Sequence, residues 1–88
     1  MNNIEKEIRE LIVKVNDQFV SVNLTDTSSL QDYGFSSLDF VKLVMFVELE
    51  FELEIPVEYM HFAFIDSISK IADIVRKIKE GNSDDIHE

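Results

Sequence analysis

Apolar residues recur at the period of an α-helix in three separate stretches of this chain of 88 residues. The stripes run through residues 4–19, 38–51 and 68–78, with the intervals of three and four that mark the buried face of an amphipathic helix. Glycine and proline, which interrupt helices, occur only twice and once, and cysteine is absent. The pattern therefore predicts an all-α domain with one small core and no disulfide or thiolate metal site.

The stripes and the residues that begin and end helices place four helical segments. We expect a first helix from about Asn3 to about Phe19 and a second from Ser36 or Ser37 to near Glu52. A short third helix follows Pro56 and covers Val57 to about Phe62, since proline suits the first turn of a helix. The last helix begins at a cap at Asp66-Ser67 and ends at Gly81, because a glycine commonly terminates a helix.

These segments make a small four-helix bundle of three longer helices and one short one. We assign residues 1–81 to this domain and residues 82–88 to a flexible acidic tail. The first two helices are joined by a long loop, residues 21–36, rich in Ser, Thr, Asp and Asn. Loops of this length are often functional. Its apolar residues should pack it against the domain; they are Val22, Leu24, Leu30, Tyr33 and Phe35.

The second helix is apolar on two sides. One side has the spacing of a core face and carries Phe40, Leu43, Val44, Val47 and Phe51. The other carries Leu38, Val41, Met45 and Leu49, between the charged residues Asp39, Lys42, Glu48 and Glu52. Such a helix is either fully buried or offers its second side to a partner. The interleaved charges favour the partner face.

Two adjacent serines stand at the start of this helix, after the turn at Gly34. Ser36 and Asp39 have the spacing of a capping box, which would occupy the Ser36 oxygen with backbone N–H groups. Ser37 would then point outward from the first turn, where unpaired N–H groups and the helix dipole stabilise a phosphate. Ser37 is the better candidate for modification, and the alternative is that both serines only cap the helix.

The formal net charge of −10 excludes a nucleic-acid-binding surface, which needs clustered Lys and Arg. Acidity favours basic protein partners, or it only keeps the protein in solution. No apolar N-terminal segment or membrane span is visible, so we expect a cytoplasmic monomer without membrane contact. His61 and His87 have no metal-ligand spacing, and neither a metal site nor the catalytic site of an independent enzyme is expected.

Three pieces of the sequence, in this order, resemble the acyl and peptidyl carrier proteins. The first is residues 30–43, LQDYGFSSLDFVKL, which is similar to the attachment site of that family. The second is residues 48–56, ELEFELEIP, and the third begins with FIDSI at residues 64–68. The resemblance covers roughly residues 4–80 and implies a phosphopantetheine-binding carrier of the same four-helix fold.

The resemblance implies that Ser37 receives 4′-phosphopantetheine from coenzyme A through a separate phosphopantetheinyl transferase. The thiol of that arm would hold an acyl or aminoacyl group as a thioester, supplied by a loading ligase and used by synthase or transferase enzymes. The chain would then be a carrier and a cosubstrate, not an enzyme. Partner enzymes with basic docking patches would contact an apolar centre ringed by acids: Leu38, Val41 and Met45, with Asp39, Glu48 and Glu52 around them.

Three questions stay open at this level. Ser36 stands where the family usually has Asp, which leaves the subtype open. Lys42 stands where fatty-acid carriers usually have an acid, and Phe46 and Leu49 make this helix more apolar than theirs; both changes favour a dedicated carrier of a specialised pathway, polyketide and nonribosomal peptide routes included. An interior channel for cargo between the second and last helices is possible, lined by Phe40, Met60, Phe62, Phe64 and Ile71, and so is a filled core. The rival function is an unmodified acidic helical bundle with an interaction or regulatory role.

Overall fold

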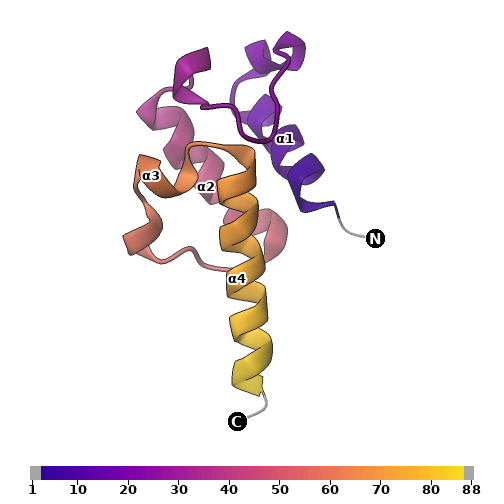
Figure 1. Ribbon diagram of the computed structural model, residues 1–88, viewed down its shortest axis with the longest axis vertical. Helices are drawn as coiled ribbons and strands as arrows, with labels where there is room; N and C mark the ends of the chain where they lie inside the picture. The colour runs from indigo at the N-terminus through magenta and orange to yellow at the C-terminus, as the bar shows by residue number, and fades with distance from the viewer. Residues whose placement is uncertain (1–2, 87–88) are drawn as a thin grey trace.

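The computed structural model describes the backbone of residues 3–86 and the side chains of residues 3–81. Four α-helices are present within this part of the chain (Figure 1): α1 (Ile4–Val15), α2 (Ser37–Phe51), α3 (Phe62–Ile65) and α4 (Ile68–Ile86). Three short 3₁₀ turns connect them, at Asp17–Ser21, Gln31–Tyr33 and Val57–Tyr59. The described residues form no strand. The expected all-α bundle with one short helix is confirmed.

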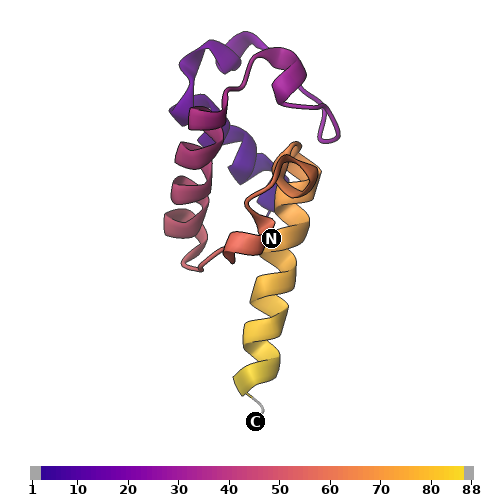
Figure 2. The ribbon, with the colours of Figure 1, turned by 90° about the vertical axis from the view of Figure 1, so that its left-hand side faces the viewer.

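One hydrophobic core holds the helices together. Helix α1 packs against both α2 and α4, and α3 packs against α4. Figures 1 and 2 show α4 as the longest element, with its last turns extending beyond the other helices. The five core positions expected on α2 are all buried, as are Ile68, Ile71, Ala72 and Val75 on α4. The helical stripes therefore identified most of the core, although Ile78, expected on the same face of α4, is only partly buried and the buried Ile74 was not included.

The first helix is shorter than expected, because it ends at Val15 and not near Phe19. Asn16 leaves the helix with extended backbone angles, and its side-chain oxygen accepts a hydrogen bond from the N–H of Gln18. Such local side-chain bonds compete with helix propagation. The chain continues as a 3₁₀ turn that still buries Phe19, so the apolar stripe continues although the α-helix does not.

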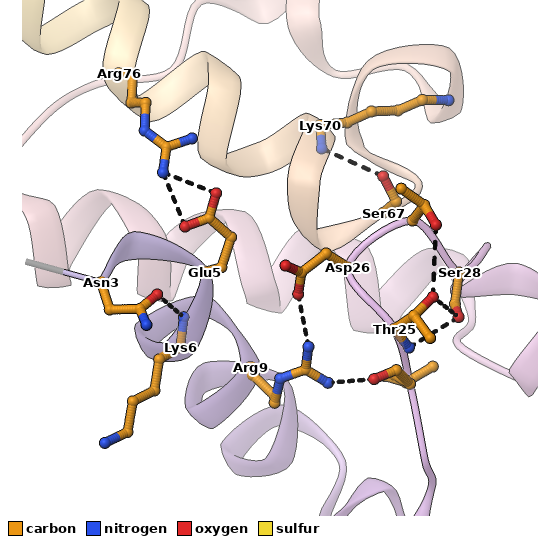
Figure 3. A network of polar contacts seen from close by, with 12 residues as sticks. Asn3, Glu5, Lys6, Arg9, Thr25, Asp26, Ser28, Ser67, Lys70 and Arg76 are labelled. Carbon is orange, nitrogen blue, oxygen red and sulfur yellow. Dashed lines mark hydrogen bonds and ion pairs between the residues drawn. The ribbon is translucent and has the colours of Figure 1, made fainter.

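The long loop is tied to the start of α4. The Asp66 carboxylate accepts hydrogen bonds from the Ser29 hydroxyl at 2.6 Å and the Gln31 N–H at 3.3 Å. The loop is also bonded to α1: the Arg9 guanidinium on α1 donates to the Asp26 carboxylate at 2.6 Å, and Figure 3 shows this contact. Leu24, Leu30 and Phe35 are buried and Val22 packs against the core, as expected. Tyr33 was wrongly included, because its side chain is about half exposed.

A salt bridge joins the beginning of α1 to α4. One guanidinium nitrogen of Arg76 lies 2.8 and 2.7 Å from the two carboxylate oxygens of Glu5, as Figure 3 shows. This hydrogen bonding to Arg76 holds the pKa of the Glu5 carboxyl below its ordinary value. The same contact raises the pKa of Arg76. Two helices that are distant in sequence are thus linked outside the core.

The third helical segment differs from the expected single helix at 57–62. It is split into the 3₁₀ turn at Val57–Tyr59 and helix α3, with Met60 and His61 between them. His61 is extended, with φ −145° and ψ 140°, and its ring Nδ1 accepts a hydrogen bond from the Ala63 N–H at 3.1 Å. His61 therefore caps α3, at a position where the sequence predicted that the helix beginning at Val57 would continue.

The expected end of the last helix at Gly81 is wrong, because α4 continues to Ile86. Among the described residues with positive φ, the only glycine is Gly34, so Gly81 does not adopt the left-handed conformation that ends helices. A single glycine costs a helix only about 1 kcal/mol relative to alanine, which the neighbouring turns can offset. The expected start is confirmed, because the Ser67 hydroxyl oxygen accepts the Lys70 N–H at 3.2 Å. The side chains of residues 82–88 lie outside the described residues, and their role as a flexible tail stays a prediction.

Candidate functional site

A sharp turn delivers the two serines to the start of α2. Gly34 has φ 96°, a left-handed conformation that suits glycine because it has no Cβ. Ser36 is the N-cap, and its hydroxyl oxygen accepts the Asp39 N–H at 3.1 Å. The Asp39 carboxylate in turn accepts the Ser36 N–H at 3.0 Å. The expected capping box is confirmed, and it occupies Ser36 and Asp39 with each other.

Ser37 is the first residue of α2 and is exposed. Its hydroxyl makes no hydrogen bond within the described part of the chain, and neither do the backbone N–H groups of Ser37 and Leu38. Two open donors at the positive end of a helix dipole are suited to a phosphate oxygen. The site thus offers an accessible hydroxyl with the surroundings that a phosphodiester on that oxygen requires.

A row of aromatic rings supports the turn from inside. The Phe35 ring lies edge-on to Phe19 at 5.3 Å and to Phe40 at 4.9 Å between ring centroids. Phe40 is in turn 5.2 Å from Phe62 on α3. Since edge-to-face aromatic pairs stabilise beyond their buried area, the row packs the turn before Ser37 against the 3₁₀ turn at Asp17–Ser21, α2 and α3. The hydroxyl is therefore presented by a rigid element.

An apolar cleft of about 320 Å³ opens beside Ser37, between α2 and α3. Besides Ser37 it is lined by Phe40, Val41, Val44, Met60, His61, Phe62 and Ile65. The cargo channel was expected in the interior, between the second and last helices, and this cleft lies elsewhere; of the residues named for that channel, Phe40, Met60 and Phe62 line the cleft. Two do not, because Phe64 points into a different hollow and Ile71 is buried in the core. Sequence reasoning did not place Val41, Val44, His61 and Ile65 in such a lining, since their placement there depends on how α3 crosses α2.

The apolar side of α2 that was predicted to meet partners is exposed. The exposed fractions are 62% for Leu38, 56% for Val41 and 56% for Met45, and 74% for Leu49 further along the helix. Together they form a continuous apolar strip that begins next to Ser37. Its use by partner enzymes stays a prediction.

The three predicted acidic contacts are not equivalent. Asp39 is half-buried in the capping box, with one carboxylate oxygen 3.5 Å from the Asn16 side-chain nitrogen. Glu48 is also half-buried, and its carboxylate accepts the Ile55 N–H at 2.9 Å, which holds the chain after α2. Glu52 is exposed and makes no side-chain hydrogen bond among the described residues. Only Glu52 has a carboxylate that is not committed within the domain.

The described part of the chain contains neither a cluster of metal-ligating side chains nor a membrane-spanning helix. No group of three or more His, Asp or Glu side chains lies close enough to hold a metal ion. Within residues 3–86 there is also no helix that combines the length and the hydropathy needed to cross a bilayer.

The fold and this geometry define a small helical bundle that presents one uncommitted hydroxyl at a helix N-terminus. Residues 6–75 match the family model described as "Phosphopantetheine attachment site". Similar proteins include an acyl carrier protein of Buchnera aphidicola subsp. Acyrthosiphon pisum, 35% identical over 77 residues, which are 88% of this chain and 94% of the relative. Another, from Buchnera aphidicola subsp. Schizaphis graminum, is 44% identical over 55 residues, or 62% and 70% of the two chains. An acyl carrier protein of Rickettsia massiliae is 29% identical over 80 residues, or 91% and 87%. No solved structure matches the chain.

The chain belongs to the phosphopantetheine-binding family of acyl carrier proteins. It is a carrier and not a catalyst, and its cofactor is covalently bound 4′-phosphopantetheine. The exposed hydroxyl of Ser37 and the open N–H groups beside it fit such a group. When bound, the group supplies a thiol, which the chain itself lacks because it has no cysteine.

Proposed function

We propose that Ser37 is the attachment residue and that the protein shuttles acyl groups, held as thioesters, between biosynthetic enzymes. The observation that carries this proposal is the uncommitted Ser37 hydroxyl at the N-terminus of α2. Attachment breaks the pyrophosphate bond of coenzyme A: the Ser37 oxygen loses its proton and forms the phosphodiester bond, and adenosine 3′,5′-bisphosphate leaves. The N–H groups of Ser37 and Leu38 can then donate to a phosphodiester oxygen and orient the arm at its root.

The cleft supports an acyl cargo over a polar aminoacyl one. Phe40, Val44 and Ile65 line it with apolar atoms, and burying a hydrocarbon chain against them is favourable by about 25 cal/mol per Å². A polar aminoacyl group would gain little from these walls. We therefore propose fatty or polyketide acyl groups as cargo and a cytoplasmic location, where coenzyme A and the partner enzymes are available.

The α2 strip is proposed as the docking surface for the transferase, the loading ligase and the synthase enzymes. Leu38, Val41 and Met45 provide an apolar centre, and Glu52 is an acid available to attract a basic patch. Asp39 and Glu48 act chiefly within the domain, because each accepts a backbone N–H. Contacts of this kind are brief, which suits a protein that must be passed from one enzyme to the next.

The test is covalent loading followed by intact mass measurement. The full chain, made in a host without a compatible transferase, is incubated with coenzyme A and a promiscuous phosphopantetheinyl transferase. The expected result is a gain of one phosphopantetheine, which Ser37→Ala abolishes and Ser36→Ala retains. If the wild-type chain stays unmodified while a control carrier is loaded, the proposal fails and the unmodified regulatory bundle takes its place.

A further inference from the structure

A second hollow, of about 190 Å³, lies between α3 and α4. It shares no lining residue with the cleft at Ser37. One wall comes from the region of α3 and the other from α4; the lining residues are Tyr59, Ala63, Phe64, Lys70, Asp73, Ile74 and Lys77. The proposed carrier function does not use any of them.

The α3 wall of this hollow is aromatic and partly open to solvent. The Phe64 side chain is 46% exposed. Its ring lies edge-on to Tyr59, with 5.6 Å between the centroids. At the base of the hollow Ile74 is buried. An apolar side chain of a binding partner could therefore pack against Phe64 and Ile74. The contact would bury the exposed surface of the Phe64 ring and that of the partner's side chain.

The α4 wall carries two cations whose charges are not used within the domain. Lys70 and Lys77 are exposed, and neither ammonium has an ion pair or hydrogen bond among the described residues. In Figure 3 the Lys70 side chain extends away from the polar network, and no dashed line reaches its ammonium. By contrast, Arg9 and Arg76 are both paired with carboxylates. Asp73, between the two lysines, lies 3.7 Å from Arg76.

In a chain with a net charge of −10, this combination is complementary to an acidic ligand and unlike the surface of α2. We propose that the α3–α4 hollow binds an acidic amphipathic helix of a partner protein. Lys70 and Lys77 are seven residues apart on one helix, which is two turns or about 10.5 Å along its axis. Carboxylates at positions i and i+7 of a partner helix have the same spacing, and an apolar residue between them would enter the hollow.

A partner on this face leaves Ser37 and the α2 strip available, because the two hollows have separate linings. The protein could thus be held in an assembly by one surface while it serves enzymes with the other. A second copy of the chain fits less well, since two molecules of the same large negative charge repel each other. A small anion fits less well too, because much of the hollow is apolar.

The test uses a synthetic amphipathic peptide of about 18 residues, long enough to form a helix on the surface. It carries Glu at i and i+7 and Leu at i+3 and i+4; a control peptide has Lys in place of Glu. Both are titrated into the full chain labelled with ¹⁵N, followed by amide shifts. Saturable shifts around Tyr59, Phe64, Lys70 and Lys77, with the acidic peptide only, are expected. Shifts confined to α2, or tighter binding of the basic peptide, would overturn the proposal.

Variants separate the site from general charge effects. Lys70→Glu with Lys77→Glu should weaken the acidic peptide at least tenfold, which is about 1.4 kcal/mol, because two exposed ion pairs are lost and replaced by repulsion between like charges. Phe64→Ser should weaken it through loss of apolar contact, and circular dichroism checks that the variant is folded. The matched control is Lys42→Glu on α2, expected to change binding less than about twofold. Equal loss with that control, or sedimentation showing that a second copy covers the face, would refute the assignment.

Discussion

Alanine substitutions of the two adjacent serines should have opposite effects on stability and on loading, because Ser36 caps α2 and Ser37 is the proposed attachment residue. The Ser36 hydroxyl oxygen accepts the Asp39 N–H at 3.1 Å, and loss of an N-cap side chain costs about 1 kcal/mol. In Ser36→Ala the Asp39 N–H loses this partner, while the Asp39 carboxylate can still accept the backbone N–H of residue 36. The loss should therefore remain near that value and not double it.

Ser37→Ala removes a hydroxyl that makes no hydrogen bond within the described residues. Alanine is also the better helix former, so the free energy of unfolding should change by less than about 0.5 kcal/mol. The two variants are compared by urea unfolding followed by circular dichroism at 222 nm. Ser36→Ala should also unfold at about 4–8 °C lower temperature, as expected for a domain of this size.

Covalent loading with phosphopantetheine is the second measurement that distinguishes the two variants, since only Ser37→Ala should prevent attachment. The reasoning is refuted if the two variants lose equal stability, or if Ser37→Ala is the less stable of the two. It is equally refuted if Ser36→Ala, folded and close to wild-type stability, can no longer be loaded. Either result would mean that the capping box does not divide the roles of the serines as the structure indicates.

Four further predictions concern the rest of the domain. Val41→Glu should leave the free energy of unfolding within about 0.5 kcal/mol, because the side chain is exposed, but raise the KM of the transferase for the carrier. Asp66→Ala should lower the free energy of unfolding by about 2 kcal/mol in urea melts, because the Ser29 and Gln31 donors lose a charged acceptor. Glu48→Gln should reduce stability by weakening the bond to the Ile55 N–H, whereas Glu52→Gln should slow association with basic partners at low salt and leave stability unchanged. Arg76 lowers the pKa of Glu5 in the folded state. The stability that this pair contributes is therefore fully present above the ordinary glutamate pKa of 4.5. It is lost as the pH falls through the lowered pKa. Urea melts of wild type and Arg76→Gln should therefore converge in acid, and a constant difference across that range would contradict the assignment.

The features that sequence reasoning identified correctly are those decided within one or two helical turns. The capping box needs only Ser36 and Asp39 at a spacing of three, and both hydrogen bonds are present. The core face of α2 follows from the period of the helix, and all five of its residues are buried. Such local agreement between propensity and fold is what makes short patterns informative.

The features that it missed depend on competition or on distant partners. Asn16 could have continued α1, but its side chain bonds to the next turn. Gly81 could have ended α4, but the helix passes through it. The split before α3 is set by His61. Its ring Nδ1 accepts the hydrogen bond of the Ala63 N–H, in place of the backbone carbonyl that a longer helix would have supplied. At Asn16 and His61 a local side-chain hydrogen bond decided between two outcomes, and at Gly81 the cost of one glycine, about 1 kcal/mol, was too small to end the helix.

The acids of α2 show why surface charge alone is a poor guide to a docking site. Asp39, Glu48 and Glu52 look equivalent in the sequence, as acids around an apolar strip. In the structure the Asp39 carboxylate accepts the Ser36 N–H at the start of α2, and the Glu48 carboxylate accepts the Ile55 N–H after the helix. Of the three, only Glu52 makes no side-chain hydrogen bond among the described residues. A carboxylate that holds a backbone N–H would leave that donor unpaired if it turned to a partner, at a cost of about 1–3 kcal/mol where the group is buried. All three acids keep their charge and should contribute to electrostatic steering, but a contact that requires a carboxylate to give up an internal hydrogen bond should use Glu52 before Asp39 or Glu48.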